Sequence, residues 1–252
     1  MDIVELIESC SADGRAVVVG HDWGAVVAYV LALRFSSKVS ALISLCTPYV
    51  PPQHWAGSGG EDDVGTTYRS YFQKKGPADE ELSRDVALTI TALFRLPHES
   101  LMSLDRIEKA TVLGGIFVDL PEPIPKSELM SDDDFEVYKA AFLKTGFTGA
   151  LSWYRNDVAN RNYALEAPSP IIELPTLMIS AGMDPLWPPS TTACMAHFVP
   201  NCVFTTIEKA GHWIQQQCGD QVASIILDWL NEAEGPGPHI AGNCDVTSST
   251  VQ

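Results

Sequence analysis

The chain has 252 residues, of which 46% are apolar and 19% charged. This composition is typical of a globular domain with a hydrophobic core, and it excludes a disordered, a collagen-like and a coiled-coil chain. The 16 basic and 32 acidic residues give a net charge of −16, which would repel a nucleic-acid backbone or an anionic membrane. We therefore expect neither nucleic acid nor a membrane as a partner.

Targeting signals and cysteines indicate in which compartment the protein works. No apolar run approaches the roughly 18 residues that span a bilayer, and the N-terminal residues carry acids where a signal peptide has basic residues. The six cysteines are widely separated and include no C-x-x-C pair, so we expect them to be reduced and structural. The sequence predicts a soluble, cytoplasmic protein without a metal site.

The N-terminal part of the chain predicts a helix, a strand and a second helix in close succession. Residues 2–10 place Ile3, Leu6 and Ile7 on one stripe of a helix. Residues 16–19 (Ala-Val-Val-Val) predict a strand without polar alternation, so we expect both of its faces to be buried, as in a parallel sheet. Residues 25–35 are apolar nearly all round, which predicts a helix buried against that sheet.

The rest of the chain completes an α/β pattern around a long helical insertion. Further strands are predicted at 39–45, 176–180 and 203–207, and an amphipathic closing helix at 220–230. Between the second and third strands, the periodic segments 82–96 and 133–144 predict helices, so we interpret the insertion as a cap.

The insertion also holds a glycine-rich loop at 56–60 and acidic runs at 61–63 and 132–134, which we interpret as solvated surface. The residues after 234 have few large apolar side chains. We therefore divide the chain into the following parts: an N-terminal part of the core at 1–49, a helical cap at 50–170, a C-terminal part of the core at 171–234 and a disordered tail at 235–252.

The turn between the first strand and the second helix carries the first catalytic candidate. The segment Gly20-His21-Asp22-Trp23-Gly24 has the form G-x-D-x-G, and a strained turn at this position presents a nucleophile above the sheet. We expect small residues to be sterically required at both ends of the turn. The alternative is a tight loop in which Asp22 only caps the helix.

Two more candidates follow the third and fourth strands. Asp184 comes directly after the third strand and His212 shortly after the fourth, so the chain order is nucleophile, acid, base, as in an α/β-hydrolase triad. Separately, Asp184 before Pro185 could be a turn former, and His212 a surface residue. An acid after the second strand could also orient the histidine, but Cys46-Thr47-Pro48 offers none. Asp184 is therefore the predicted acid.

Three segments of the sequence resemble those of a known family. The segments GHDWGA, SWYRN and AGHW are similar to those of the soluble epoxide hydrolases of the α/β-hydrolase fold, and the similarity extends over roughly residues 1–232. Residues 68–73 and 144–156 look like the two cap segments that bear the epoxide-binding tyrosines of the family. The resemblance implies an α/β-hydrolase fold with a mostly parallel sheet and an inserted α-helical cap.

The resemblance also implies a mechanism. Asp22 would attack an epoxide carbon while Tyr68 and Tyr154 donate hydrogen bonds to the ring oxygen, and the product would be a vicinal diol. His212, held by Asp184, would activate the water that hydrolyses the ester on Asp22. The backbone N–H of Trp23 would supply one oxyanion-hole donor, and no metal or cofactor would be needed.

Several aromatic side chains are candidates for substrate binding. Tyr71 is a possible substitute for Tyr68, although an aromatic residue in a helical cap is ordinarily a packing residue. If the cap closes over the sheet, the expected lining of an apolar pocket is Phe72, Tyr71, Trp153, Trp187 and Trp213.

The sequence departs from the family at its N-terminal side. Family members carry a longer segment before the nucleophile strand, with the first four strands and an H-G-x-P loop that gives a second oxyanion donor. That motif does not occur here, and loss of one such donor costs about 2.7 to 4 kcal/mol of transition-state stabilisation. The strand at 16–19 would then be an unpaired edge, which favours partner pairing.

Three explanations follow for the short N-terminal side: an incomplete form of a full enzyme, which we favour, a short protein that pairs its exposed strand in a homodimer, or a non-catalytic paralogue. The leading function is epoxide hydrolysis of a small-molecule epoxide. The alternatives are a haloalkane dehalogenase, in which the Trp23 indole would hold the halide, and a truncated binding protein without turnover. The sequence does not identify the epoxide or its stereochemistry.

Overall fold

The computed structural model describes residues 2–55, 68–101, 103–121 and 123–234. Its centre is a parallel sheet of four strands in the order β1-β2-β3-β4, formed by Ala16–His21, Val39–Leu45, Thr176–Ala181 and Cys202–Ile207. The register pairs Val18 with Leu42 and Met178 with Phe204. All four strands predicted from the sequence are confirmed, and they form the predicted parallel sheet of an α/β fold.

Helices cover the two faces of the sheet because neighbouring residues of a strand point to opposite sides. Leu42 and Met178 pack on the face that holds α2 (Trp23–Arg34) and α10 (Met195–Phe198). Ile43 and Ile179 pack on the other face, against α11 (Ile214–Gln217) and α12 (Gly219–Glu234).

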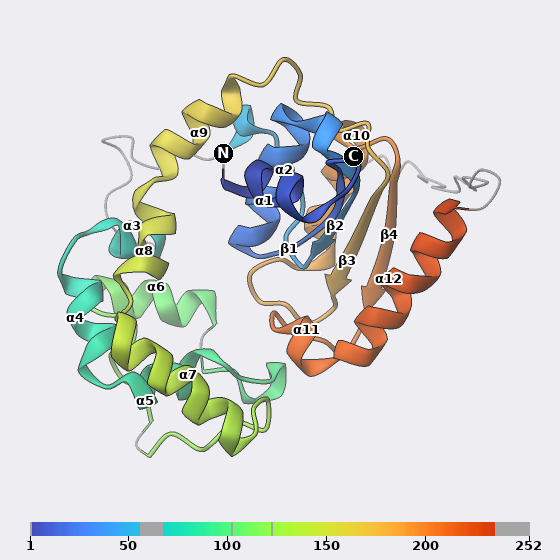
Figure 1. Cartoon of the computed structure of the whole chain (residues 1–252). Helices are drawn as coiled ribbons and strands as arrows, with labels where there is room; N and C mark the ends of the chain where they lie inside the picture. Colours follow the sequence, from blue (N-terminus) through green and yellow to red (C-terminus); the bar gives the residue numbers. More distant parts are fainter. Residues whose placement is uncertain (1, 56–67, 102, 122, 235–252) are drawn as a thin grey trace, which may run out of the picture.

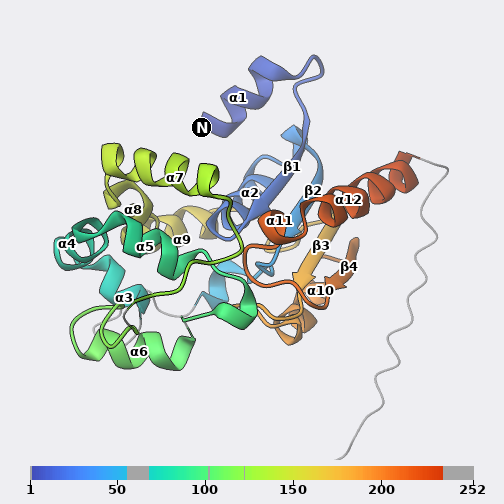
Figure 2. The ribbon, with the colours of Figure 1, turned by 90° about the horizontal axis from the view of Figure 1, so that it is seen from below.

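The first helix, α1 (Asp2–Cys10), lies at the end of the core beyond β1 (Figure 2). It buries Val4 and Ile7 against Leu31 of α2 and Val39 of β2. The apolar stripe predicted for residues 2–10 is therefore only partly buried, because Leu6 is exposed while Ile7 is buried.

The helices between β2 and β3 form a separate group beside the sheet, here called the helical insert (Figure 1). All but the last of them share one hydrophobic cluster that includes Tyr71, Phe72 and Leu151. The insert consists of α3 (Tyr68–Gln73), α4 (Pro77–Arg84), α5 (Val86–Leu93), α6 (Leu104–Val112), α7 (Asp132–Thr145), α8 (Thr148–Arg155) and α9 (Asp157–Leu165). Short 3-10 turns lie at Ser36–Lys38, Pro52–His54, Pro97–Glu99 and Pro189–Cys194.

The prediction of one helix over residues 82–96 is wrong. The chain breaks at Asp85, whose backbone is extended and whose carboxylate accepts a hydrogen bond from the N–H of Leu88 at 2.9 Å. An aspartate in this position begins a new helix, because it satisfies an otherwise unpaired N–H of the first turn. The second helix ends at Leu93, which leaves residues 94–96 in the loop next to the core.

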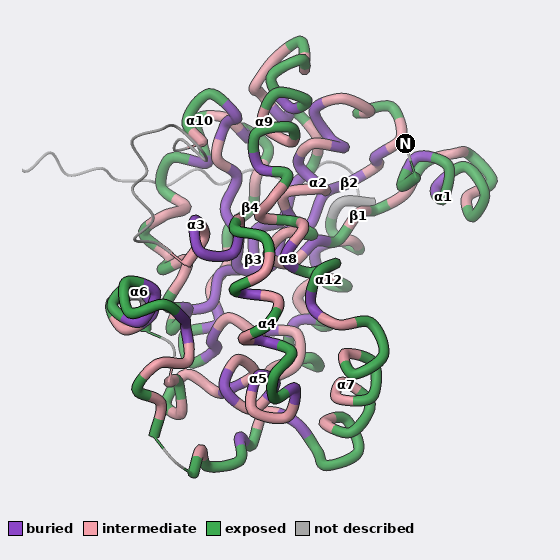
Figure 3. Tube along the Cα trace, turned by 90° about the vertical axis from the view of Figure 1, so that its left-hand side faces the viewer, coloured by how far each residue is buried: buried purple, intermediate pink, exposed green. Residues whose placement is uncertain are grey.

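The prediction that the strand at 16–19 has two buried faces is also wrong. Val17 and Val19 are 40% and 51% exposed, on the face where α12 covers β2 and β3. Figure 3 colours the chain by burial, and α7 at the periphery shows only the exposed and intermediate colours. β4 likewise exposes Val203 and Phe204. In the described part of the chain β1 and β4 are the two edges of the sheet, and an edge strand lacks the neighbour whose helices would complete its burial.

The acidic run at 132–134 is exposed, in the first turn of α7. The segments 56–60, 61–63 and 235–252 lie outside the described residues. The five cysteines that the structure describes are free thiols. None of the helices described is long and apolar enough to cross a membrane.

Candidate active site

The three predicted triad residues meet at one edge of the sheet. Asp22 follows β1, Asp184 follows β3, and His212 lies on the loop after β4. Because the strands are parallel, their carboxyl ends lie at the same edge, where α/β proteins build their sites. The structure brings all three side chains into one hydrogen-bonded chain.

The backbone of Asp22 is strained, as predicted for the turn that carries it. Its φ of 52° and ψ of −122° lie in a region that residues with a side chain rarely adopt. Its carbonyl accepts the first hydrogen bond of α2, from Ala25 N at 3.0 Å, but its side chain makes no capping hydrogen bond. The alternative that Asp22 only caps the helix is therefore wrong, and its carboxylate is directed to the cavity instead.

The two glycines of the turn differ in what they tolerate. A Cβ on Gly20 would lie 2.4 Å from the carbonyl oxygen of Gly24 and 2.6 Å from Ala25 Cα. A Cβ on Gly24 would meet no atom within 4 Å. The steric requirement for a small residue holds at position 20 and is wrong at position 24.

His212 lies between the two carboxylates. Its Nδ1 is 2.9 Å from Asp184 Oδ2, and its Nε2 is 3.3 Å from Asp22 Oδ1. Burial lowers the pKa of His212, but the hydrogen bonds to the two carboxylates outweigh it and raise the pKa to about 9. The imidazole is therefore protonated at pH 7.

Asp184 is suited to hold the imidazole. Its side chain is fully buried, and besides His212 it accepts hydrogen bonds from the N–H groups of Leu186 at 2.8 Å and Trp187 at 3.2 Å. Burial acts to raise the pKa of Asp184, but these hydrogen bonds and the His212 charge hold it below its ordinary range. Asp184 thus carries a negative charge that fixes the orientation of His212.

The two cap tyrosines face the same cavity as Asp22. Tyr68 from α3 and Tyr154 from α8 lie edge to face, with ring centroids 6.0 Å apart. Burial raises the pKa of both phenols, so both keep their protons at pH 7 and can act as hydrogen-bond donors.

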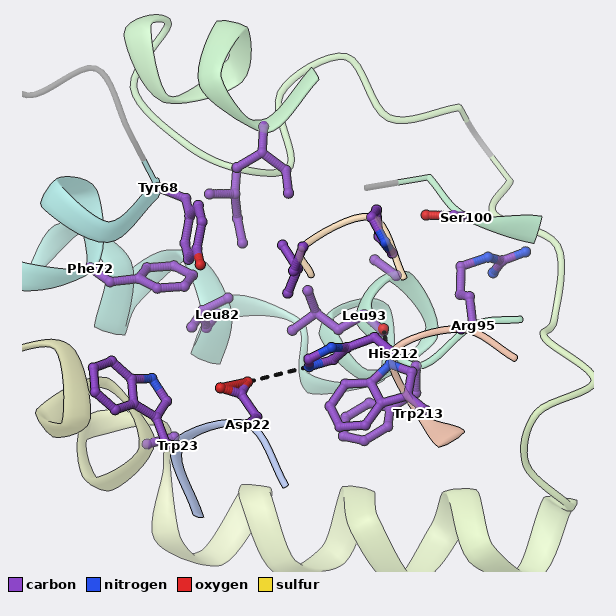
Figure 4. Close-up of a pocket in the computed structure, with 18 of the residues that line it drawn as sticks. Asp22, Trp23, Tyr68, Phe72, Leu82, Leu93, Arg95, Ser100, His212 and Trp213 are labelled. Atoms are coloured by element: carbon purple, nitrogen blue, oxygen red, sulfur yellow. Dashed lines mark hydrogen bonds and ion pairs between the residues drawn. The ribbon is translucent and has the colours of Figure 1, made fainter. Parts of the chain in front are cut away.

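The cavity has a volume of about 400 Å³ and lies between the sheet edge and the helical insert. In Figure 4, Tyr68, Phe72 and Trp23 lie on one side of Asp22, and His212 and Trp213 lie on the other. The indole N–H of Trp213 donates to the carbonyl of Leu93 at 2.9 Å, which ties the core to the insert.

Phe72, Trp153 and Trp213 line the cavity as expected, but Tyr71 and Trp187 do not. Tyr71 points into the insert, where its hydroxyl donates to Glu81 Oε2 at 2.9 Å. Consecutive turns of α3 thus send Tyr68 and Tyr71 to different surroundings, and Tyr71 is not placed to substitute for Tyr68.

Trp23 opens α2, and an N–H in the first turn of a helix has no acceptor within that helix. Its indole stacks on Trp153 with centroids 6.3 Å apart and meets Tyr154 edge-on at 5.3 Å. The guanidinium of Arg69 lies 5.2 Å from the Trp23 ring. These contacts pack the indole among aromatic and cationic groups beside the cavity.

Sequence reasoning missed two residues behind the triad. His21 and Cys46 approach His212 so closely that the ligand atoms of the three side chains lie within 4.8 Å of one another. Such a set could hold a metal ion, but the ring nitrogens of His212 already face two carboxylates. The only sequence signal was the place of His21 beside the nucleophile and of Cys46 at the end of a strand.

The α/β-hydrolase fold family matches residues 2–217, and the chain belongs to that family. Its relatives include epoxide hydrolases, which confirms the resemblance noted in the sequence. Bifunctional epoxide hydrolase 2 from Mus musculus is 33% identical over 233 residues, covering 88% of this chain and 40% of the relative. Epoxide hydrolase A from Mycobacterium tuberculosis is 32% identical over 243 residues, covering 92% of this chain and 74% of the relative.

Solved structures give the same grouping. Epoxide hydrolase A from Mycobacterium thermoresistibile superposes with a TM-score of 0.76 at 29% identity, covering 91% of this chain and 73% of that one. An epoxide hydrolase from an endophytic Streptomyces gives 0.77 at 27% identity, covering 92% and 72%. The chain therefore spans about two fifths of the mouse relative and nearly three quarters of these bacterial structures.

Proposed function

We propose that this chain is an epoxide hydrolase that opens a small epoxide to a vicinal diol through an ester on Asp22. The observation that carries the proposal is one cavity holding a carboxylate free of capping, a histidine bound to a buried acid, and two neutral phenols. A carboxylate nucleophile forms an ester with an alkyl carbon, and water can then attack the ester carbonyl. This chemistry suits a strained ring.

Ring opening would use Asp22 and the two tyrosines. The carboxylate attacks one ring carbon, the C–O bond breaks, and Tyr68 and Tyr154 donate hydrogen bonds to the oxygen that becomes an alkoxide. One phenol gives its proton to the alkoxide, and the imidazolium of His212 then gives a proton back to that phenol. This step ends with an ester, an alcohol and a neutral His212.

Hydrolysis of the ester would use His212 and Asp184. Esterification removes the negative charge that lies 3.3 Å from Nε2, so the pKa of His212 falls and the neutral imidazole can take a proton from water. The hydroxide attacks the carbonyl of the Asp22 ester, with the Trp23 N–H as an oxyanion donor. The bond between the carbonyl carbon and the diol oxygen then breaks, and this oxygen takes the proton of the new carboxylic acid. Hydrolysis thus releases the diol and restores the Asp22 carboxylate and the His212 imidazolium, and no step requires a metal or cofactor.

The substrate would be held by apolar contact. Phe72, Trp153 and Trp213 offer aromatic surface to the hydrocarbon part of an epoxide, and the cavity volume of about 400 Å³ suits a small molecule. A simple aryl epoxide such as styrene oxide is therefore the first substrate to test.

A single turnover in ¹⁸O-water tests the proposal. If the ester mechanism operates, the first diol contains unlabelled oxygen from Asp22, and Asp22→Asn forms no diol while keeping the backbone conformation that asparagine tolerates. Diol that carries ¹⁸O from the first turnover would refute the covalent route. Release of chloride from a chloroalkane, without diol from epoxides, would indicate a dehalogenase instead, and a folded protein that binds epoxides without turnover would indicate a binding role.

Three further assignments belong to the same proposal. We infer that residues 50–170 act as a cap on a core made of 1–49 and 171–234, that the protein works in the cytoplasm, and that β1 offers an edge through which two copies could pair. The exposed Val17 and Val19 on β1 support the homodimer. Light scattering during gel filtration tests it, and a monomer at micromolar concentration would exclude it.

A further inference from the structure

The main-chain carbonyl of His212 accepts hydrogen bonds from two side chains outside the triad. His21 Nε2 is 2.7 Å from this oxygen, and Cys46 Sγ is 3.4 Å from it. His21 is the last residue of β1, and Cys46 directly follows β2. The catalytic histidine is thus tied by its backbone to the ends of two neighbouring strands, apart from the hydrogen bonds of its imidazole.

The partners of His21 fix its tautomer. A carbonyl oxygen only accepts, so Nε2 carries the hydrogen, and Nδ1 is the acceptor for the amide of Gln215 at 3.3 Å. Burial lowers the pKa of His21, and the charge of His212, whose ring is 4.7 Å away, lowers it further. His21 therefore stays neutral at pH 7 and acts as a fixed donor.

Cys46 is buried and has an unfavourable backbone conformation. The residue is 1% exposed, and its φ of 64° lies in the left-handed region that side chains avoid. Burial raises the pKa of its thiol, so the sulfur keeps its hydrogen and can donate it to the His212 carbonyl. This strained residue at the end of β2 is placed against the loop that carries the base.

Other hydrogen bonds anchor the loop on each side of His212, but they do not hold its own carbonyl. On the N-terminal side, Gly211 N donates to Gln217 Oε1 at 2.8 Å, and on the C-terminal side the Trp213 carbonyl accepts from Gln217 N at 2.9 Å. Because rotation of the His212 peptide would swing its imidazole, the two hydrogen bonds to the carbonyl limit where Nε2 can lie. A misplacement of about 1 Å at a catalytic group costs roughly 100-fold in rate.

We propose that His21 and Cys46 are positioning residues that hold the main chain of His212 so that its Nε2 activates water against the Asp22 ester. The inference rests on the proposed function and deepens it, because it assigns the two side chains to the second step only. Ring opening depends on the positions of Asp22 and the tyrosines and takes only a proton from His212, whereas hydrolysis of the ester depends on where Nε2 of His212 lies.

The test compares the two steps in matched variants. His21→Phe keeps a ring but removes the donor, and His21→Gln keeps an N–H near the position of Nε2. In single turnovers with styrene oxide, we expect His21→Phe to form the ester within about threefold of the wild-type rate and to hydrolyse it at least about tenfold more slowly. The ester then accumulates and is seen as a mass increase of the intact protein, and His21→Gln recovers part of the loss.

A variant of Cys46 and a control variant of a remote histidine complete the experiment. Cys46→Ala, which only shortens a side chain, should slow hydrolysis in the same direction, and it keeps the proposal testable if His21→Phe does not fold. His197→Phe, on an exposed residue outside the cavity, is the matched control and should change neither step. Equal slowing of both steps in His21→Phe and Cys46→Ala, or unchanged hydrolysis in both, would overturn the proposal.

A second measurement separates this inference from the proposed function. If the wild type forms no ester, the proposed function fails, and ¹⁵N NMR of the histidine rings still decides the geometry. The inference expects His21 to carry its hydrogen on Nε2 at pH 7, and the His212 ring signals to shift in His21→Phe far more than in His197→Phe. A hydrogen on Nδ1 of His21, or unshifted His212 signals, would overturn it.

Discussion

A methyl group on Gly20 should damage the protein, whereas the same group on Gly24 should not. The Cβ of Gly20→Ala would lie 2.4 Å from a backbone carbonyl oxygen and 2.6 Å from Ala25 N and Cα. Reaching even a 3.0 Å contact requires the strand and the first turn of α2 to separate by 3.0 − 2.4 = 0.6 Å. Overpacking costs about 1 to 3 kcal/mol, and we expect the upper end because every contacting atom is backbone.

Urea unfolding followed by tryptophan fluorescence measures both variants. We expect Gly20→Ala to lower the free energy of unfolding by about 3 kcal/mol with an unchanged dependence on urea. Gly24→Ala lies at the second position of α2 with open space around it, so it should stabilise the protein by up to about 1 kcal/mol. Equal stability of the two variants would show that the turn is not packed as described.

Four other variants test the site. The pKa of His212 is raised in the folded protein to about 9, so its stabilising contribution is complete below pH 6.5 and is lost as the pH rises through 9. The difference in unfolding free energy between the wild type and His212→Gln should therefore shrink by about 3 kcal/mol from pH 6 to pH 10, and a constant difference would contradict the raised pKa. Tyr154→Phe should slow ring opening about 100-fold in a single turnover. Tyr71→Phe should leave ring opening unchanged and lower the free energy of unfolding by about 1 kcal/mol, because the Tyr71 hydroxyl bonds to Glu81. Asp184→Asn should slow hydrolysis of the ester by about 1,000-fold or more, and detection of diol at the wild-type rate would exclude Asp184 as the acid.

The order of the elements, and the three polar residues that meet at the edge of the sheet, could be predicted from the sequence alone. Buried strands and the turns after them are local features, because runs of β-branched residues and small turn residues act over a few positions. Asp22, Asp184 and His212 could therefore be placed at strand ends from the sequence, and parallel strands then place those ends at one edge. The break at Asp85 was also a local signal, since aspartate favours the start of a helix.

Which side chains share the cavity, and which contact the His212 main chain, became clear only from the three-dimensional packing. Tyr68 and Tyr71 occupy one short helix and look alike in the sequence, but the packing of α3 turns one toward Asp22 and the other toward Glu81. The contact of His21 and Cys46 with the His212 carbonyl joins residues far apart in the chain. Periodicity and propensity describe neighbours along the chain, whereas these contacts depend on how the strands and the helical insert pack together.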